Sequence, residues 1–259
     1  MEDFQRPLDR DLIKQLDIID KTDISKLIDT KLIKPYLDDV NTIGFNFEGV
    51  ELTPEQFPDR KDLHDVVQDC TRILHLKKTP RVFIANRPGL NAMTMNIADP
   101  IIVLHSSILR RYADPAELRF IVGHEMGHIK CRHVKWMVFL HAAKKALPPG
   151  FDTAGLLPLL KWAREAEMSA DNAGLICSQD LRAAERALMR LVLNMDEATI
   201  GEINVDAFLA QSETQDVSKF AEVVQYGRHL TRQHPFIPDR IREMRAYAKS
   251  RKYQHLLEH

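Results

Sequence analysis

The chain has 259 residues, of which 44% are hydrophobic and 28% are charged, an ordinary composition for a globular protein with a sizeable core. Its 36 Lys and Arg residues nearly balance its 37 Asp and Glu residues, which gives no reason to expect a nucleic-acid partner. Three cysteines without a CxxC pair argue against a disulfide scaffold and fit a reducing compartment. The charged first residues contain no apolar signal core, so we expect a cytoplasmic location.

Residues 1–56 are expected to form a helical segment that packs on the main domain. Apolar residues recur at helical spacing in two stretches, first Leu8, Leu12, Leu16 and Ile19, then Ile24, Leu27, Ile28 and Leu32. Residues 41–58 carry two glycines and two prolines and are predicted to be loop. The segment could frame the functional cleft as a regulator or serve as scaffold, and the sequence leaves both interpretations open.

Residues 57–256 are expected to form one α+β domain, predominantly α, with a small β-sheet among many helices. A long helix is predicted from Asp59, followed by short strands at 81–85, 91–96 and 101–104. After about residue 106 the pattern is helical almost to the end. Asp114, Pro115 and Glu117 mark a helix start, with an N-cap, a proline at N1 and an acid at N3. Residues 257–259 resemble the remnant of an expression tag.

No stretch reaches the roughly 18 uninterrupted apolar residues that a transmembrane helix needs. The nearest candidate, Trp136 to Leu160, is interrupted by Lys144 and Lys145 and by a Pro-Pro-Gly turn. We therefore expect no span, although this segment could contact a membrane surface.

The helix that starts after Asp114 carries the sequence His124-Glu125-Met126-Gly127-His128. Positions i and i+4 differ by about 40° around a helix, so both imidazoles leave the same face about one turn apart. This spacing suits two ligands of one tetrahedral zinc ion. Glu125 lies about 100° around from His124, where it is placed to take a proton from water beside the metal rather than to bind the metal. Two satisfied core histidines beside a surface glutamate are the alternative interpretation.

A third ligand must come from elsewhere in the chain. The positions where a metzincin has Gly and His hold Cys131 and Val134, which excludes that class. His133 lies about 140° from His128 on an uninterrupted helix and is expected to point elsewhere. Two glutamates of a later helix compete, and Glu167 shares its face with small and apolar residues, whereas the face of Glu165 is polar. Because a buried carboxylate needs a partner, Glu167 is the predicted ligand.

Asp171 lies one turn beyond Glu167 on the same side of that helix. It could accept a hydrogen bond from the N–H group of a ligating histidine. The alternative is an ion pair with a basic residue one turn away, and the sequence leaves both open.

With these residues in view, the chain resembles the gluzincin family that includes the HtpX-type proteases, the CaaX prenyl proteases and the OMA-type peptidases. The resemblance covers roughly residues 80–245, and three features in order carry it. The first is a strand pattern, Pro80 to Ile84, Asn91-Ala92 and Pro100 to Val103, which leads into the His124 motif. The second is Arg164-x-x-Glu167-x-x-Ala170-Asp171, and the third is His234-Pro235 followed by Arg240-Ile241.

The resemblance implies a zincin-like metallopeptidase domain in which Asn91 to Met95 form the edge strand that binds an extended substrate. It also implies that His234 lies near the metal and that Arg240 belongs to the same site. A surface or helix-capping role for His234, and plain core packing for the Met-rich strand, are the alternatives. Family members often have Asn-Ala-Phe-Ala-x-Gly where this chain has Asn91 to Asn96, so the substrate preference does not carry over.

The sequence therefore predicts a zinc-dependent peptidase, most simply an endopeptidase, with one Zn²⁺ per chain held by His124, His128 and Glu167. Metal-activated water would attack a peptide bond of a peptide or protein substrate, and Glu125 would be the general base. The competing hypothesis is a zinc-containing peptide-binding or assembly module without turnover. The oligomeric state is left open.

Overall fold

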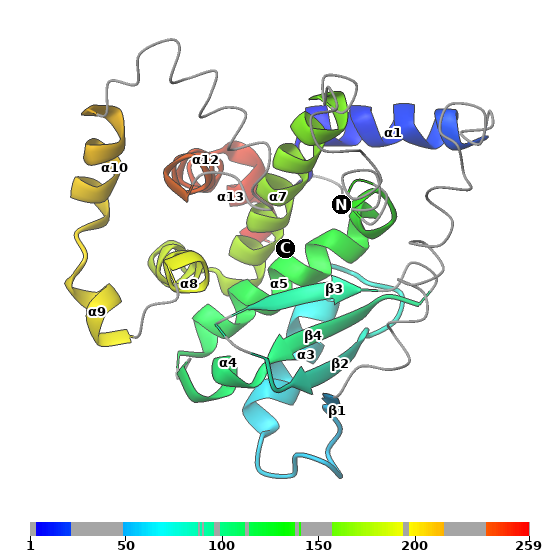
Figure 1. The fold of residues 1–259 in the computed structure, drawn as a ribbon, viewed down its shortest axis with the longest axis vertical. Coiled ribbons are helices and arrows are strands. Elements are labelled where there is room, and N and C mark those ends of the chain that lie inside the picture. Colours follow the sequence, from blue (N-terminus) through cyan, green and yellow to red (C-terminus); the bar gives the residue numbers. More distant parts are fainter. Residues whose placement is uncertain are drawn as a thin grey trace, which may run out of the picture.

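The computed structural model describes residues 4–21, 49–87, 89, 91–95, 99–111, 114–137, 140, 157–193, 197–214 and 237–258. The helices are α1 (Pro7–Lys21), α3 (Lys61–Ile73), α4 (Ser106–Arg111), α5 (Pro115–Lys130), α7 (Leu157–Ser178), α8 (Leu181–Leu193), α9 (Glu197–Glu202), α10 (Val205–Thr214), α12 (Ile237–Ala248) and α13 (Arg251–Leu257). The strands are β1 (Gly49–Glu51), β2 (Arg81–Ala85), β3 (Ala92–Met95) and β4 (Ile101–His105). This arrangement confirms the predicted α+β, predominantly α fold (Figure 1).

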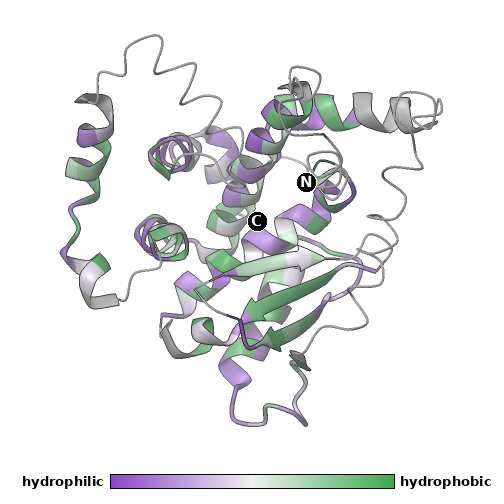
Figure 2. Cartoon of the chain, viewed as in Figure 1, coloured by the Kyte–Doolittle hydropathy of each residue, from purple (hydrophilic) through white to green (hydrophobic). Residues whose placement is uncertain are grey.

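The four strands form one mixed sheet in the order β1-β2-β4-β3. The parallel pair β2 and β4 lies in the middle, with Val82 opposite Ile102, while β1 and β3 run antiparallel to their neighbours. All five residues of β4 are buried, which explains its continuous apolar sequence, and both central strands are strongly hydrophobic in Figure 2. Among the described strands β3 therefore forms one edge of the sheet.

Helix α5 runs through the centre of the molecule, between the sheet and the helices α7 and α8 (Figure 1). It contacts β3 and α3 as well as α7 and α8. Residues on all its sides are buried, including Phe120, Ile121, Val122 and Met126. A helix that is apolar all around must be covered on every side, and this is why the His124 motif lies inside the protein.

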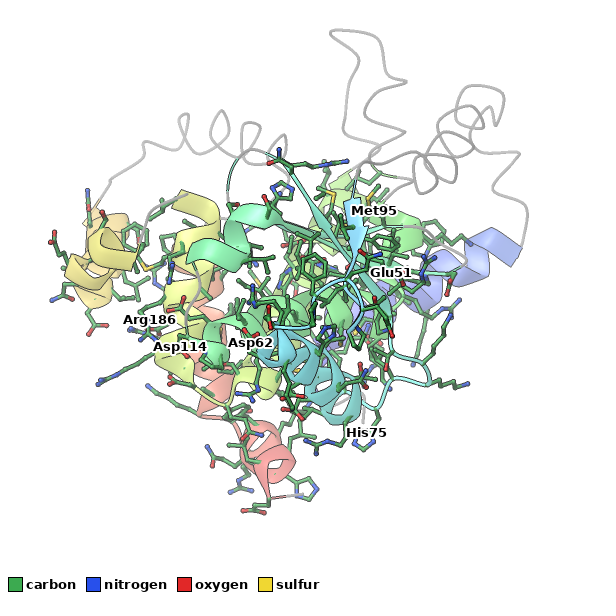
Figure 3. The ribbon with its side chains drawn as sticks, turned by 90° about the horizontal axis from the view of Figure 1, so that it is seen from below. Glu51, Asp62, His75, Met95, Asp114 and Arg186 are labelled. Atoms are coloured by element: carbon green, nitrogen blue, oxygen red, sulfur yellow. The ribbon has the colours of Figure 1, made fainter. Side chains whose placement is uncertain are left out.

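The start of α5 is fixed by the cap that the sequence predicts. The Asp114 side chain accepts a hydrogen bond from the Ala116 amide at 2.8 Å, and Pro115 occupies the first helical position. Asp114 and Glu117 also pair with Arg186 of α8, at 2.8 Å each, and Figure 3 shows Arg186 beside Asp114. The cap therefore holds α5 in register with α8.

Two glycines allow α5 to approach α7 closely. A Cβ atom added at Gly123 would lie 2.6 Å from Cys177 Cβ, and one added at Gly127 would lie 2.8 Å from Ala173 Cβ. Such distances are shorter than real Cβ contacts, so only glycine fits at the present helix separation. This close contact places the middle of α7 against the His124 motif.

Residues 49–51, which the sequence predicts to be loop, form the strand β1. Three residues are too few to show the alternation of apolar and polar side chains by which a strand is predicted from sequence. The predicted second helix at residues 24–32 lies outside the described residues. The division at residue 56 and the tag remnant stay predictions.

Candidate functional site

The side chains of His124, His128 and Glu167 converge between α5 and α7. The two Nε2 atoms lie 3.2 Å apart. Glu167 Oε1 lies 3.5 Å from His128 Nε2, and its Oε2 lies 3.8 Å from His124 Nε2. All three residues are buried, with 5–8% of their surface exposed. The structure thus brings together the residues predicted as metal ligands.

This arrangement fits a small tetrahedral cation. Ligand atoms about 2.0–2.1 Å from a tetrahedral zinc ion lie about 3.3 Å from one another. The separation of the two Nε2 atoms is close to this value, and each Nε2 atom has one oxygen of Glu167 at 3.5 or 3.8 Å. A cation between the two ring nitrogens and the carboxylate would be paired with a buried negative charge, which favours its binding. Two imidazoles and one carboxylate also form a donor set that catalytic zinc sites use.

Asp171 fixes the outer nitrogen of His124. Its Oδ1 lies 3.0 Å from His124 Nδ1, and because a carboxylate only accepts, the ring donates its Nδ1–H, which in the neutral ring leaves the lone pair at Nε2, the atom that faces the site. Arg240 of α12 donates two hydrogen bonds to Asp171, at 2.6 and 2.7 Å. Burial alone would raise the pKa of Asp171, but Arg240 and His124 outweigh it, so the pKa lies below its ordinary value and the group stays ionised.

The outer nitrogen of His128 contacts His133, a residue that the helical spacing predicts to point elsewhere. The two Nδ1 atoms lie 3.0 Å apart. The expectation assumed an uninterrupted helix, but α5 ends at Lys130 and Arg132 has a left-handed backbone with φ of 62°. This break turns His133 back toward the site. His133 Nε2 in turn lies 3.0 Å from the carboxylate of Asp9 in α1, a residue that no sequence pattern singled out.

The electrostatic surroundings suit a cation. Burial lowers the pKa of His128 well below its ordinary value, so this ring is neutral and its lone pair is available. Burial also acts to lower the pKa of His124, but hydrogen bonding and charge from Asp171, with charge from Glu167 and Glu125, raise it overall. Three carboxylates against the guanidinium of Arg240 leave net negative charge around the two imidazoles, which favours a divalent ion.

Glu125 lies beside the two histidines at a cavity of about 150 Å³. Thr94 of β3 donates its hydroxyl hydrogen to the Glu125 carboxylate, at 2.6 Å. The cavity is lined by both histidines, Glu125, Glu167 and the strand residues Ala92 to Thr94. A carboxylate that can move a proton therefore lies in the same space as the candidate ligands and the edge of the sheet.

The other predicted site residues have different outcomes. Arg240 is buried and also lies 3.5 Å from Glu167, so it belongs to the cluster around the ligands. The Asn91 side chain accepts a hydrogen bond from the Ala92 amide, at 2.9 Å, at the start of β3. His234 lies outside the described residues. The competing glutamate Glu165 pairs with Arg6 instead of facing the histidines.

A family model matches residues 58–248, and it is that of peptidase family M48. The chain therefore belongs to peptidase family M48, which makes it a member of a metallopeptidase family and confirms the resemblance to HtpX-type and OMA-type enzymes. The predicted ligands and Glu125 all lie within the matched residues.

Two similar proteins come from Arabidopsis thaliana. The plastoglobule-localized metallopeptidase 48 of the chloroplast is 33% identical over 207 residues, which cover 76% of this chain and 59% of that protein. The mitochondrial metalloendopeptidase OMA1 is 30% identical over 105 residues, which cover 37% of this chain and 21% of that protein. The chain thus matches less than two thirds of the length of either relative.

Within the part of the chain that the structure describes, none of the helices has the length and hydrophobicity required to span a membrane.

Proposed function

We propose that this chain is a zinc-dependent endopeptidase that cuts peptide or protein substrates. The observation that carries the proposal is the convergence of two imidazole nitrogens and one carboxylate, all within 4.8 Å, beside a further carboxylate in a cavity. In this proposal His124, His128 and Glu167 hold one Zn²⁺ per chain. When bound, the ion supplies Lewis acidity to the reacting carbonyl group and to water.

Glu125 is the proposed general base. It would take a proton from the attacking water and deliver it to the leaving nitrogen of the cut peptide bond. The hydroxyl of Thr94 holds one oxygen of this carboxylate, which limits the directions that Glu125 can point. Asp171 and Arg240 would keep the His124 ring oriented throughout the reaction.

The edge strand β3 is the proposed binding site for the substrate backbone. It pairs on one side with β4, and its residues Ala92 to Thr94 line the cavity next to the candidate ligands. An extended peptide could add to this edge by main-chain hydrogen bonds, with its side chains in alternating positions. Such pairing reads a stretch of backbone rather than a chain end, which favours an endopeptidase. The cytoplasmic location expected from the sequence stays a prediction.

The test is the substitution Glu125→Gln, which keeps size and removes the base. We expect zinc content to remain at one ion per chain while cleavage of a labelled unfolded protein falls by a factor on the order of 10² or more. Glu202→Gln, the same change at an exposed position of α9, is the matched control and should leave cleavage unaltered. Cleavage by Glu125→Gln at the wild-type rate would refute the assignment. Tight binding of peptides by the wild-type chain without cleavage would favour the module without turnover.

A further inference from the structure

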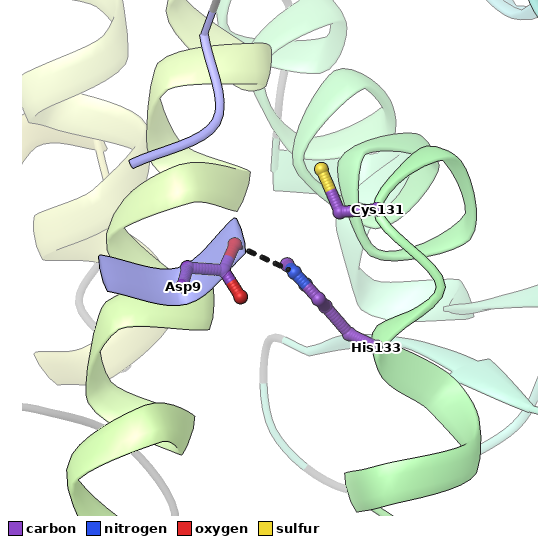
Figure 4. Close-up of side chains that lie close together, drawn as sticks. All are labelled: Asp9, Cys131 and His133. Carbon is purple, nitrogen blue, oxygen red and sulfur yellow. Dashed lines mark hydrogen bonds and ion pairs between the residues drawn. The ribbon is translucent and has the colours of Figure 1, made fainter. Parts of the chain in front are cut away.

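A buried chain of hydrogen bonds leads from His128 to the N-terminal helix α1. His128 Nδ1 lies 3.0 Å from His133 Nδ1, and His133 Nε2 lies 3.0 Å from Asp9 Oδ2. The side chains of Asp9 and His133 are fully buried. Figure 4 shows α1 bringing Asp9 to His133, which belongs to the segment after α5. Asp9 and His133, which lie 124 positions apart in the sequence, are thereby linked to the candidate metal ligand His128.

The chemistry of the groups sets the direction of each hydrogen bond. An ionised carboxylate only accepts, so His133 donates its Nε2–H to Asp9. A neutral imidazole protonated at Nε2 has its lone pair at Nδ1, and there it accepts the Nδ1–H of His128. His128 then carries its own lone pair at Nε2, the atom that faces His124 and Glu167. This series of hydrogen bonds therefore selects the tautomer of His128 that a metal requires.

Asp9 is held firmly enough to play this part. Trp162 donates its indole N–H to Asp9 Oδ1 at 2.9 Å, and Gln5 donates to Oδ2 at 3.1 Å. The indole ring of Trp162 also packs edge-on against His133, with the ring centres 5.8 Å apart. Both carboxylate oxygens thus accept from fixed donors.

The same residues form a second group with metal-ligand chemistry, because ligand atoms of Asp9, Cys131 and His133 lie within 4.8 Å of one another. The hydrogen bonds argue against a metal ion there. Both oxygens of Asp9 already accept hydrogen bonds, and both ring nitrogens of His133 contact Asp9 or His128. The group is therefore better described as part of a hydrogen-bonded chain.

Further contacts hold the residues that precede α1 against α7 and α12. Arg6 pairs with Glu165 of α7 and with Glu243 of α12. Asn172 of α7 donates a hydrogen bond to the backbone oxygen of Phe4 at 3.0 Å. These contacts fix residues 4–9 along α7, so the position of Asp9 depends on the docking of the N-terminal segment.

We propose that Asp9 is a positioning residue for the metal centre, which orients His128 through His133 and makes the N-terminal segment a determinant of metal affinity. The inference rests on the proposed function only in taking His128 as a ligand. It goes beyond family membership, because Asp9 lies outside residues 58–248, the range that the family model matches.

The first test measures zinc affinity of the full chain by competition with a chromophoric chelator. In Asp9→Asn the negative charge is lost and the new amide N–H group must face a donor, either that of Trp162 or those of Gln5 and His133. The hydrogen bond from His133 is therefore weakened in the first orientation and lost in the second. We expect the affinity to fall 10- to 100-fold, the usual effect of losing such an outer partner. Asp11→Asn is the matched control, because it removes the same charge from an exposed position of α1, and its affinity should equal that of the wild type.

A double variant separates positioning from a general structural role. His133→Leu should lower the zinc affinity to a similar degree. The double variant Asp9→Asn, His133→Leu should bind zinc little more weakly than either single variant, because both substitutions disrupt the same series of hydrogen bonds. The proposal would be overturned if the losses of zinc affinity in the two single variants added fully in the double variant. It would also be overturned if the Asp9→Asn protein bound zinc as tightly as the wild type. A wild-type chain that binds no zinc would refute the proposed function instead.

Nuclear magnetic resonance of the zinc-loaded wild type, labelled with ¹⁵N at histidine, needs no variant. The proposal requires His128 to be protonated at Nδ1 and His133 at Nε2. Protonation of His133 at Nδ1 would contradict it, as would two zinc ions per chain with one bound at Cys131.

Discussion

The close contact between α5 and α7 predicts the effect of adding one methyl group at Gly127. Alanine there would place its Cβ 2.8 Å from Ala173 Cβ and 3.1 Å from Ala170 Cα, against an ordinary contact of at least 3.4 Å. Glycine to alanine in a helix gains about 1 kcal/mol from helix propensity. Overpacking a tight contact costs about 1–3 kcal/mol. We therefore expect Gly127→Ala to be less stable by about 1 kcal/mol, a fall in Tm of roughly 2–4 °C.

The assay is thermal unfolding of the metal-free and zinc-loaded chain. Because the added methyl pushes on Ala170, one turn from Glu167, the loss of Tm should be larger with zinc than without it. Gly201→Ala is the control, since a Cβ at Gly201 meets nothing within 4 Å and should raise Tm or leave it unchanged. Adding Ala173→Gly to Gly127→Ala should recover part of the loss. A Gly127→Ala chain as stable as Gly201→Ala would refute the close packing.

Three further outcomes follow from the site. Thr94→Val removes the hydroxyl that holds Glu125, so kcat should fall about tenfold while zinc content is unchanged; an unaltered kcat would show that this hydrogen bond does not matter. Arg240→Met leaves the buried Asp171 without its guanidinium, so the free energy of unfolding should fall by about 3–5 kcal/mol, measured by urea titration, and a loss below 1 kcal/mol would contradict the ion pair. Removing zinc with a chelator should lower Tm, because an ion in 100-fold excess over its Kd stabilises the native state by about 2.7 kcal/mol, and readdition should restore it.

The centre of the fold was predictable because its signals are local. The Asp114 cap, the apolar strands predicted at 81–85 and 101–104, and the one-turn spacing of His124 and His128 each depend on neighbouring residues. Glu167 could be separated from Glu165 because small residues on one face of α7 predict close packing. Arg6 pairs with Glu165, so this residue has a different partner.

Two outer residues of the site, Asp9 and His133, were not predictable in the same way. Asp9 reaches His133 only because α1 packs on α7, and no spacing rule connects positions 124 residues apart. His133 was misplaced because the helix break at Arg132 depends on one left-handed residue that is not a glycine. Tertiary packing determines both contacts, and a single sequence carries no local trace of them.

The most direct test of the account is an anomalous difference map at the zinc edge from crystals grown with zinc. The account predicts one strong peak about 2.0–2.2 Å from His124 Nε2, His128 Nε2 and a carboxylate oxygen of Glu167. A peak held by other residues, or these three groups too far apart to share one ion, would contradict it.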